Sequence, residues 1–362
     1  MVSRSGFMRV AACVGAALLV QTGLAAALTP EEVLTYNGQD RDSVLVDGAK
    51  QEGALVLYCS MIVNQALRPI ADAFSQRYPF IKLTYWRADS GETFAKVSAE
   101  ERANNVVADV VEGTGVGEPI VAAGLSEPFS SPAVADYPAQ YRDPHHMWAA
   151  TRLSYYGLAY NTHLVPAGTQ PKSYNDLLDP NWKGKMAWRI GPAGGTEIFI
   201  SSVRAAWGED KGMDYLKKLK NQNVINFGSG SARTLVDRVI AGEYSIALDI
   251  FAHHPLISKA KGAPVDTQLL DPVPVTAGIA VVPKGVHHPY AAMLFIDFIL
   301  SPEGQDIIAK AQYFPANPAV APLSQLAPVV PRLAGVPEIF NGPEVMAKYN
   351  EQSEQIFQDL FR

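Results

Sequence analysis

Adjacent histidines are the first residues in this chain that suggest chemistry. Six of its seven histidines form three pairs, and the pair His253–His254 directly follows an apolar run. Neutral imidazole is the commonest protein ligand for transition metals. Neighbouring side chains of an extended chain point to opposite faces, so the two rings need not reach one ion. A closed zinc site also needs about four ligands, and no His-x-His, His-Glu-x-x-His or Cys-x-x-Cys spacing supplies them. We therefore expect His253 to hydrogen-bond a ligand, with a structural role or a metal site as alternatives.

Short loops rich in glycine and hydroxyl side chains favour anion binding. Gly194, Gly195 and Thr196 stand where a predicted strand gives way to a helix. A helix N-terminus preceded by glycines presents unpaired N–H groups and the positive end of the helix dipole, which together hold phosphate or carboxylate. The stretch beginning at Ser90-Gly91 and the stretch ending at Ser231 have the same form. The alternative is that each hydroxyl only caps its own helix.

Two arginines, Arg87 and Arg189, end predicted strands just before such loops. A guanidinium group at either place can make a bidentate contact to a carboxylate or phosphonate, and a surface salt bridge is the alternative. The other candidate ligand contacts also lie at or beside strand ends: Ser60, Thr114, Gly115 and Asp249. Trp86, Tyr155 and Tyr156 are candidates for packing against a ligand's carbon frame, although core packing is the usual role of such rings.

Catalytic motifs are missing from the sequence. No Gly-x-Ser-x-Gly stretch occurs, and the segment 228–232 lacks the last glycine of that motif. The segment 113–118 fails the dinucleotide fingerprint because its third glycine comes one place early. We therefore predict a binding protein without a cofactor rather than an enzyme, and a turnover assay would distinguish the two.

The elements that must position these residues alternate between short β-rich runs and helical periodicity. This pattern predicts an α/β fold with parallel sheets. Predicted strands cover residues 54–58, 81–86, 108–111, 153–160, 186–190, 245–250 and 278–282. Predicted helices cover residues 63–74, 235–240, 290–300 and 303–311, with two more that begin near Thr93 and at Thr196.

Composition and charge exclude several classes of partner. The formal net charge is −6 and no basic cluster occurs, so nucleic acid and anionic membranes are poor candidates. We expect a monomer that binds a small molecule. Cys59 ends an apolar run and is predicted to be a buried structural thiol.

The first 27 residues have the pattern of an export signal. Arg4 and Arg9 precede an apolar run from Val10 to Val20, and small residues follow up to Ala27. We predict cleavage after Ala27 and a periplasmic mature protein. A membrane anchor is the alternative, but the apolar run is shorter than the roughly 20 residues that span a bilayer.

Two longer motifs resemble a known family. The run PKSYNDLLDPNWKGKMAW at 171–188 and the run FIDFILSPEGQ at 295–305 are similar to blocks of the family 1 extracellular solute-binding proteins of ABC importers. The resemblance covers nearly all of the predicted mature chain and is strongest to the branch that contains periplasmic ferric-ion binders.

The resemblance implies a two-lobed type II periplasmic binding fold joined by a two-strand hinge. The predicted lobes are residues 28–150 with 277–362 and residues 151–276. The family delivers its solute to a membrane permease after the lobes close on it. Gly194, Gly195 and Thr196 match the family's anion loop. A ligand-binding subunit of a membrane sensor is the alternative.

The resemblance also raises the question of iron. Ferric binders of this branch place two adjacent tyrosines after a strand like the predicted one at 245–250, and phenolate oxygens suit hard Fe(III). This chain has Phe251 to His254 there. The acidic iron ligand of such binders has no secure match either, because Glu112 lies nearby but Thr114 occupies the aligned position. We therefore expect a small anionic solute, with ferric iron or a ferric chelate as the alternative.

Overall fold

The computed structural model describes residue 1 and residues 28–190, 195–228 and 230–362. The predicted signal peptide and its cleavage point, like Gly194 of the predicted anion loop, lie outside these described residues. No helix among the described residues is long and apolar enough to cross a membrane.

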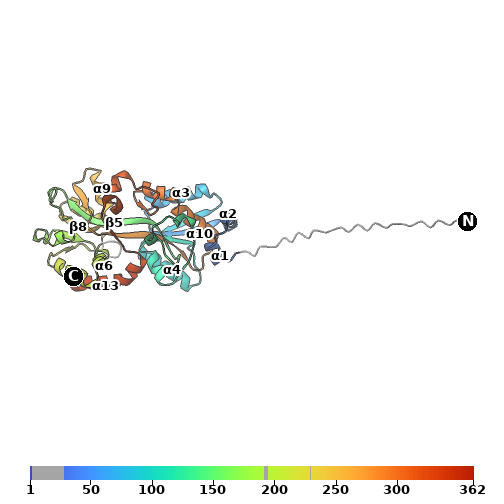
Figure 1. The fold of residues 1–362 in the computed structure, drawn as a ribbon, viewed down its shortest axis with the longest axis horizontal. Helices are drawn as coiled ribbons and strands as arrows, with labels where there is room; N and C mark the ends of the chain where they lie inside the picture. The colour runs from blue at the N-terminus through green and yellow to red at the C-terminus, as the bar shows by residue number, and fades with distance from the viewer. Residues whose placement is uncertain (2–27, 191–194, 229) are drawn as a thin grey trace.

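The described strands join into one sheet that repeats a single plan in two halves (Figure 1). In the first half, three parallel strands stand in the order β2-β1-β3 and β10 runs antiparallel to β3. In the second half, three parallel strands stand in the order β7-β6-β8 and β5 runs antiparallel to β8. The eight strands are β1 (Ala54–Cys59), β2 (Lys82–Arg87), β3 (Val110–Thr114), β5 (Ala149–Asn161), β6 (Met186–Trp188), β7 (Ile225–Asn226), β8 (Ile246–Phe251) and β10 (Val273–Pro283). The predicted α/β class with parallel strands is confirmed.

The strands β5 and β10 connect the two halves. They pair antiparallel from Val275 opposite Tyr155 to Ala280 opposite Ala149, and every residue of both strands is buried. Each is longer than predicted, because Arg152 and Thr276 interrupt the apolar pattern although both are buried inside the strands. Short strands attach to this pair: β4 (Ser126–Glu127), β9 (Val265–Gln268), β11 (Phe314–Pro315) and β12 (Glu338–Phe340).

Helices cover the sheet on both sides. The α-helices are α1 (Pro30–Leu34), α2 (Arg41–Glu52), α3 (Arg68–Arg77), α4 (Ser90–Arg102), α5 (Gly117–Ala122), α6 (Thr196–Trp207), α7 (Glu209–Lys220), α8 (Ala232–Ile240), α9 (His253–Lys259), α10 (Pro289–Leu300), α11 (Pro302–Lys310), α12 (Pro331–Ala334) and α13 (Pro343–Phe361). Short segments of 3₁₀ or π-helix lie at η1 (Val63–Leu67), η2 (Pro132–Val134), η3 (Ala139–Tyr141), η4 (Asn175–Leu178), η5 (Pro180–Trp182) and η6 (Ser324–Val329). Helix α4 begins at Ser90, earlier than predicted, because the Asp89 carboxylate accepts the Glu92 N–H at 2.9 Å and caps it.

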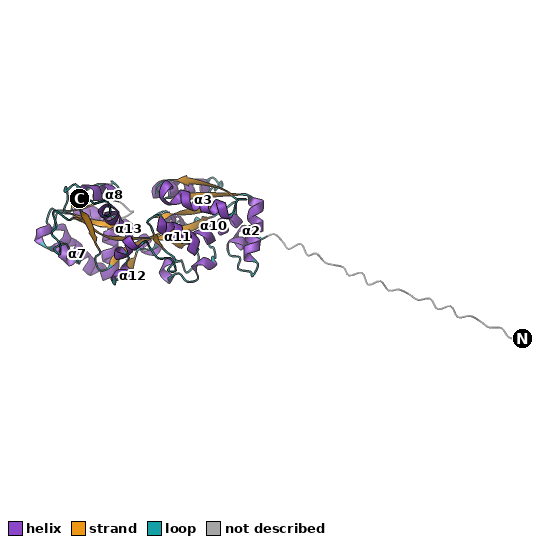
Figure 2. Cartoon of the chain, turned by 90° about the horizontal axis from the view of Figure 1, so that it is seen from above, coloured by secondary structure: helices purple, strands orange, loops and turns teal. Residues whose placement is uncertain are grey.

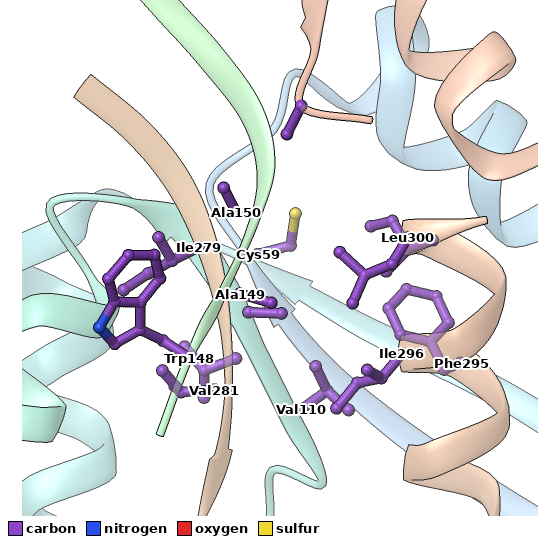
Figure 3. Close-up of a cluster of buried hydrophobic side chains, with 14 of the residues drawn as sticks. Cys59, Val110, Trp148, Ala149, Ala150, Ile279, Val281, Phe295, Ile296 and Leu300 are labelled. Atoms are coloured by element: carbon purple, nitrogen blue, oxygen red, sulfur yellow. The ribbon is translucent and has the colours of Figure 1, made fainter. Parts of the chain in front are cut away.

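Each half has its own apolar core. In the first half, α10 is apolar on nearly every side, as expected for a helix buried all round. Figure 3 shows its Phe295, Ile296 and Leu300 beside residues of β1, β3, β5 and β10, and Cys59 lies buried in this cluster as predicted. In the second half, a separate cluster forms around Trp188.

The C-terminal helix α13 was not predicted. It packs against α6 and places Phe357 in the second core, with its ring 6.3 Å from the Trp188 ring. Figure 2 shows α13 in the part of the molecule that holds α7 and α8, away from α2. The lobe boundaries stay a prediction, because α13 packs against α6 of the second half and against α5 of the first.

Candidate functional site

The candidate ligand-binding residues gather at the carboxyl ends of the two parallel strand sets. Ligands of open α/β sheets bind at this edge. In the first half, β1, β2 and β3 lead to Ser60, to Ser90 and to Gly115. In the second half, β6, β7 and β8 lead to the start of α6, to Ser231 and to His253. The strand order therefore makes three pairs of loops equivalent: Ser60 with Thr196, Ser90 with Ser231, and Gly115 with His253.

The front face of the hinge strand β5 links the two sets of loops. Side chains alternate along a strand, so Arg152 and Tyr156 share one face while Leu153 and Tyr155 share the other. Arg152 pairs with Glu112 of β3 in the first half. Tyr156 packs on Phe251 of β8 in the second half, with ring centroids 5.0 Å apart. We define the front face by Arg152 and Tyr156.

A buried carboxylate and arginine organise the first-half side of the site. Glu112 accepts hydrogen bonds from the Thr151 hydroxyl at 2.6 Å, from the Cys59 thiol at 3.1 Å and from Arg152. Burial acts to lower the pKa of Arg152, but Glu112, together with Tyr313 and Cys59, outweighs this effect, and the pKa is raised. The second terminal nitrogen of Arg152 donates to the Ser60 hydroxyl at 3.2 Å. Ser60 is therefore held by the pair.

The remaining first-half loops are tied to one another. Ser90 does not cap α4; its hydroxyl donates to the Thr114 carbonyl at 2.8 Å. Gly115 has a φ of +71°, and a Cβ there would lie 3.5 Å from the Ser90 hydroxyl. Arg87 is exposed and donates to the Ser60 carbonyl at 3.4 Å, and Gly91 is exposed beside it. These loops form a connected rim.

A second buried carboxylate organises the start of α6. Asp249 of β8 accepts the Gly195 N–H at 2.8 Å. Burial raises the pKa of Asp249 to about 8, while the Gly195 N–H and the Arg189 charge act to lower it. Gly195 has a φ of +99°, and a Cβ there would lie 2.4 Å from the Arg189 carbonyl oxygen, so only glycine fits.

Thr196 and Arg189 complete this end of the site. The Thr196 N–H donates to the Arg189 carbonyl at 3.0 Å. Its hydroxyl is buried and makes no hydrogen bond to any residue that the structure describes. Arg189 donates through Nε to the Gly230 carbonyl at 3.0 Å, and burial lowers its pKa while Tyr156 and Asp249 oppose that shift. Ser231, in contrast, is exposed and caps α8, because its hydroxyl accepts the Thr234 N–H at 3.1 Å.

The histidine pair begins a helix rather than lying in an extended chain. His253 and His254 open α9 and their rings lie 4.5 Å apart, so the expectation that they point to opposite faces is wrong. Neither Nδ1 atom has a hydrogen-bond partner among the described residues. Burial lowers the pKa of His254 to about 4 and that of His253 well below its usual value, so both rings are neutral at pH 7.

Sequence reasoning missed three charged residues of this site. Arg152 stands in the hinge, and Glu118 and Glu197 stand in the first turns of α5 and α6. Burial raises the pKa of Glu118 and of Glu197 to about 7. One Glu118 oxygen has no partner within the described part of the chain. Two features of the sequence could have identified these residues: Arg152 is a charge next to an apolar strand, and Glu118 and Glu197 each directly follow a strand-to-helix loop.

Metal binding has little support in the geometry of the described residues. Among them, no three His, Cys, Asp or Glu side chains come together in a way that could hold a metal ion. Tyr155 and Tyr156 point to opposite faces of β5, so their hydroxyls cannot share an ion.

Relatives and solved structures support a solute-binding identity. An uncharacterised protein of Haemophilus influenzae is 32% identical over 277 residues, which cover 72% of this chain and 77% of the relative. The Fe(3+)-binding periplasmic protein of Serratia marcescens is 25% identical over 56% of this chain and 64% of its own length.

The solved periplasmic binding protein AfuA from Actinobacillus pleuropneumoniae, with exogenous fructose-6-phosphate bound, has a TM-score of 0.67 and 26% identity over 86% of this chain and 99% of its own. The fold is therefore the type II periplasmic binding fold, as the resemblance implied. A sequence model described as bacterial extracellular solute-binding protein matches residues 106–329, which is more than half of the chain. The chain belongs to the family of bacterial extracellular solute-binding proteins.

Proposed function

We propose that this protein captures a small anionic solute between its two lobes and delivers it to the membrane permease of an ABC importer. The observation that carries the proposal is the start of α6. There, Gly195 and Thr196 lie beside the half-buried Arg189, and the Thr196 hydroxyl has no partner among the described residues. A buried hydroxyl left unpaired costs about 1–3 kcal/mol, which a ligand oxygen would recover.

The arrangement suits a carboxylate, phosphonate or phosphate group. The Gly195 and Thr196 N–H groups are already bonded to Asp249 and to the Arg189 carbonyl, but the positive end of the dipole of the 12-residue helix α6 still favours negative charge. The neutral His253 ring offers a hydrogen bond without adding charge. On the opposite lobe, the Ser60 and Ser90 hydroxyls stand at the matching strand ends, so closure about β5 and β10 would bring a second set of polar groups to the solute.

A ligand screen with matched variants tests this proposal. Thermal unfolding is measured with carboxylates, phosphonates, sulfonates, sugar phosphates and, as uncharged controls, sugars. A ligand present at 100 times its Kd adds about 2.7 kcal/mol to the stability of a protein that binds it only when folded. Titration calorimetry with the best ligand should show a loss of affinity of at least about tenfold in Thr196→Ala and Arg189→Gln, a difference of about 1.4 kcal/mol. Ser231→Ala, which alters only a helix cap, should bind normally. Stabilisation by uncharged sugars alone would exclude an anionic solute.

Ferric iron is the second candidate, because the Serratia relative is named for Fe(3+) binding. The chain has no tyrosine between Phe251 and His254, and the phenol of Tyr156 is hydrogen-bonded to the Thr276 hydroxyl at 3.0 Å. We therefore expect free Fe(III) to be lost easily, whereas a ferric chelate with its own anionic oxygens could occupy the anion end of the site.

Iron retention separates these cases. Purified protein is titrated with ferric citrate, desalted, and examined by metal analysis and visible spectroscopy. We expect no stoichiometric iron and no phenolate-to-iron charge-transfer band. Retained iron with such a band would establish ferric binding, and retained iron that disappears in a His253→Ala, His254→Ala double variant would establish a histidine site instead.

Export and delivery complete the proposed role. N-terminal sequencing of the protein recovered from the periplasm should begin at Leu28, as cleavage after Ala27 requires. Co-purification with a permease would support import, whereas co-purification with a membrane sensor would support the alternative role. We also propose that the protein is monomeric and has no catalytic activity; a turnover assay on the bound solute checks the latter.

A further inference from the structure

A second cavity lies behind the hinge, on the face of β5 that carries Leu153 and Tyr155. Its volume is about 340 Å³, within the range of roughly 300–1,000 Å³ typical of small-molecule sites. Because side chains alternate along a strand, this cavity is separated by β5 from Arg152 and Tyr156 on the front face. It is therefore distinct from the proposed solute site and does not depend on that proposal.

The walls of the cavity are apolar and pre-formed. Four of the lining residues are proline, whose ring fixes the backbone φ: Pro138, Pro315, Pro318 and Pro337. The Tyr155 ring packs on Phe314 at 4.7 Å and the Tyr141 ring packs on Phe340 at 5.4 Å. Walls held in place in this way lose little freedom when a ligand binds, which favours affinity.

A carboxylate with one occupied oxygen stands in this wall. Glu338 of β12 accepts hydrogen bonds at Oε1 from the Gln140 amide at 2.7 Å and from the Tyr141 hydroxyl at 2.8 Å. No residue within the described ranges donates to its other oxygen, Oε2. The carboxylate is thus held in one orientation with an acceptor left for a ligand.

Two further polar groups, the Arg332 guanidinium and the Tyr155 hydroxyl, line the same cavity and form no hydrogen bond with each other. Arg332 is exposed at the rim and makes no ion pair with Glu338 or with any other residue that the structure describes. The Tyr155 side chain is only 3% exposed, yet its hydroxyl forms no hydrogen bond within the described chain. Burial raises the pKa of Tyr155, so the hydroxyl stays protonated and can donate. The hydroxyl stays in contact with the space of the cavity, so a ligand bound there can accept its hydrogen bond in place of water.

We propose that the cavity behind the hinge binds a small zwitterion, an α-amino acid with an apolar side chain. Its ammonium group meets the free oxygen of Glu338, its carboxylate meets Arg332 and the Tyr155 hydroxyl, and its side chain packs against the prolines. An ion of a single sign would leave either Glu338 or Arg332 facing a group of like or no charge. A zwitterion satisfies both charges and accepts the hydrogen bond of the Tyr155 hydroxyl.

Six probes that differ only in charge test the class of ligand. L-leucine and L-phenylalanine carry both charged groups. 4-Methylpentanoate and 3-phenylpropanoate lack the ammonium group, and isoamylamine and phenethylamine lack the carboxylate. Titration calorimetry on the full protein should show binding of at least one amino acid, and a loss of affinity of at least about tenfold for both of its single-charge analogues. Absence of binding by both amino acids, or equal binding of an analogue, would overturn the proposal.

Matched substitutions test the place of the ligand. Glu338→Gln, which keeps the size and the Gln140 and Tyr141 contacts, should weaken the amino acid by at least about tenfold, as should Arg332→Gln. The half-buried Glu101 and the exposed Arg68, neither of which lines the cavity, provide the controls Glu101→Gln and Arg68→Gln, which should bind normally. The thermal transition of Glu338→Gln shows whether that variant folds. If it does not, Tyr155→Phe, which removes only the hydroxyl group, provides a third cavity variant. Unchanged binding in the folded cavity variants, or loss of binding in Thr196→Ala, would show that the amino acid does not sit behind the hinge.

Discussion

Asp249 joins an uncommon backbone conformation to a buried charge within the proposed site. Its φ of +53° lies in the left-handed region, which costs a residue other than glycine about 1–3 kcal/mol. In this conformation its carboxylate accepts the Gly195 N–H at the start of α6. We infer that the conformation is kept because Asp249 fixes the loop that would meet the anion.

The Asp249→Asn variant tests the energetic consequence of this buried carboxyl. Burial raises the pKa of Asp249 to about 8 in the folded protein, whereas an unfolded aspartate titrates near pH ~4. The folded state therefore holds more protons between these values, and its stability falls as the pH rises through that window. Asparagine cannot ionise, so we expect the Tm of the variant to fall less steeply than that of the wild type between about pH 5 and pH 8.

The control for this prediction is Asp214→Asn, which alters an exposed carboxyl. Glu118 and Glu197, with pKa values raised to about 7, contribute the same direction of slope in all three proteins. The difference between the variants therefore isolates Asp249. Parallel Tm curves for wild type and Asp249→Asn would contradict the raised pKa.

The residues of the proposed site divide into those with a local sequence signal and those without one. Gly195 and Thr196 could be found because a glycine before a helix has a known use. Arg152 and Glu118 could not, because their proximity depends on the register of β5 against β10 and of β10 against β3. The prediction of an extended chain at His253 and His254 failed because the apolar run before them does not indicate where the strand ends.

Among the elements, the predicted bounds of strands that lie between clear loops agree well with the structure. For the fully buried strands β5 and β10, the predicted length is shorter than the observed one. The run 54–58 differs from β1 by one residue, since Gly53 precedes it and Ser60 follows. Strand β5 begins four residues before the predicted start because Thr151 and Arg152 resemble a loop until their partners are known. The sequence pattern does not predict helix α13, because polar residues separate its buried side chains.

The packing of α13 leads to a prediction at this scale. Phe357 is 2% exposed and touches Trp188, so Phe357→Ala should lower the free energy of unfolding by about 3–5 kcal/mol. Urea unfolding followed by tryptophan fluorescence measures the loss. Gln355→Ala on the exposed face of the same helix is the control and should change stability little. A small effect of Phe357→Ala would mean that α13 contributes no core to the second lobe.

For the whole molecule, the family resemblance predicted the type II fold, while physical patterning alone predicted only the α/β class. The repeated plan of three parallel strands and one antiparallel strand explains why two lobes form. Two continuous strands between the lobes permit rotation without breaking either core.

Small-angle scattering tests this motion. We expect the radius of gyration to decrease when a stabilising solute is added, because closure brings the two lobes together. The Thr196→Ala variant at the same solute concentration should remain expanded. A solute that stabilises the wild type without compaction would mean that binding does not close the lobes.

The long route of the chain between β3 and β10 has a consequence for how the protein is made. Thr114 pairs with Gly278, so residues 164 positions apart must meet before the first sheet is complete. Contacts between such distant residues form slowly, because a long loop must close first. If the chain crosses a membrane with its N-terminus leading, as the predicted signal requires, the first lobe cannot finish folding until β10 has emerged. The order of strands would thus leave the first lobe incomplete until most of the chain has crossed, although the strands of the second half all precede β10 and can pair earlier.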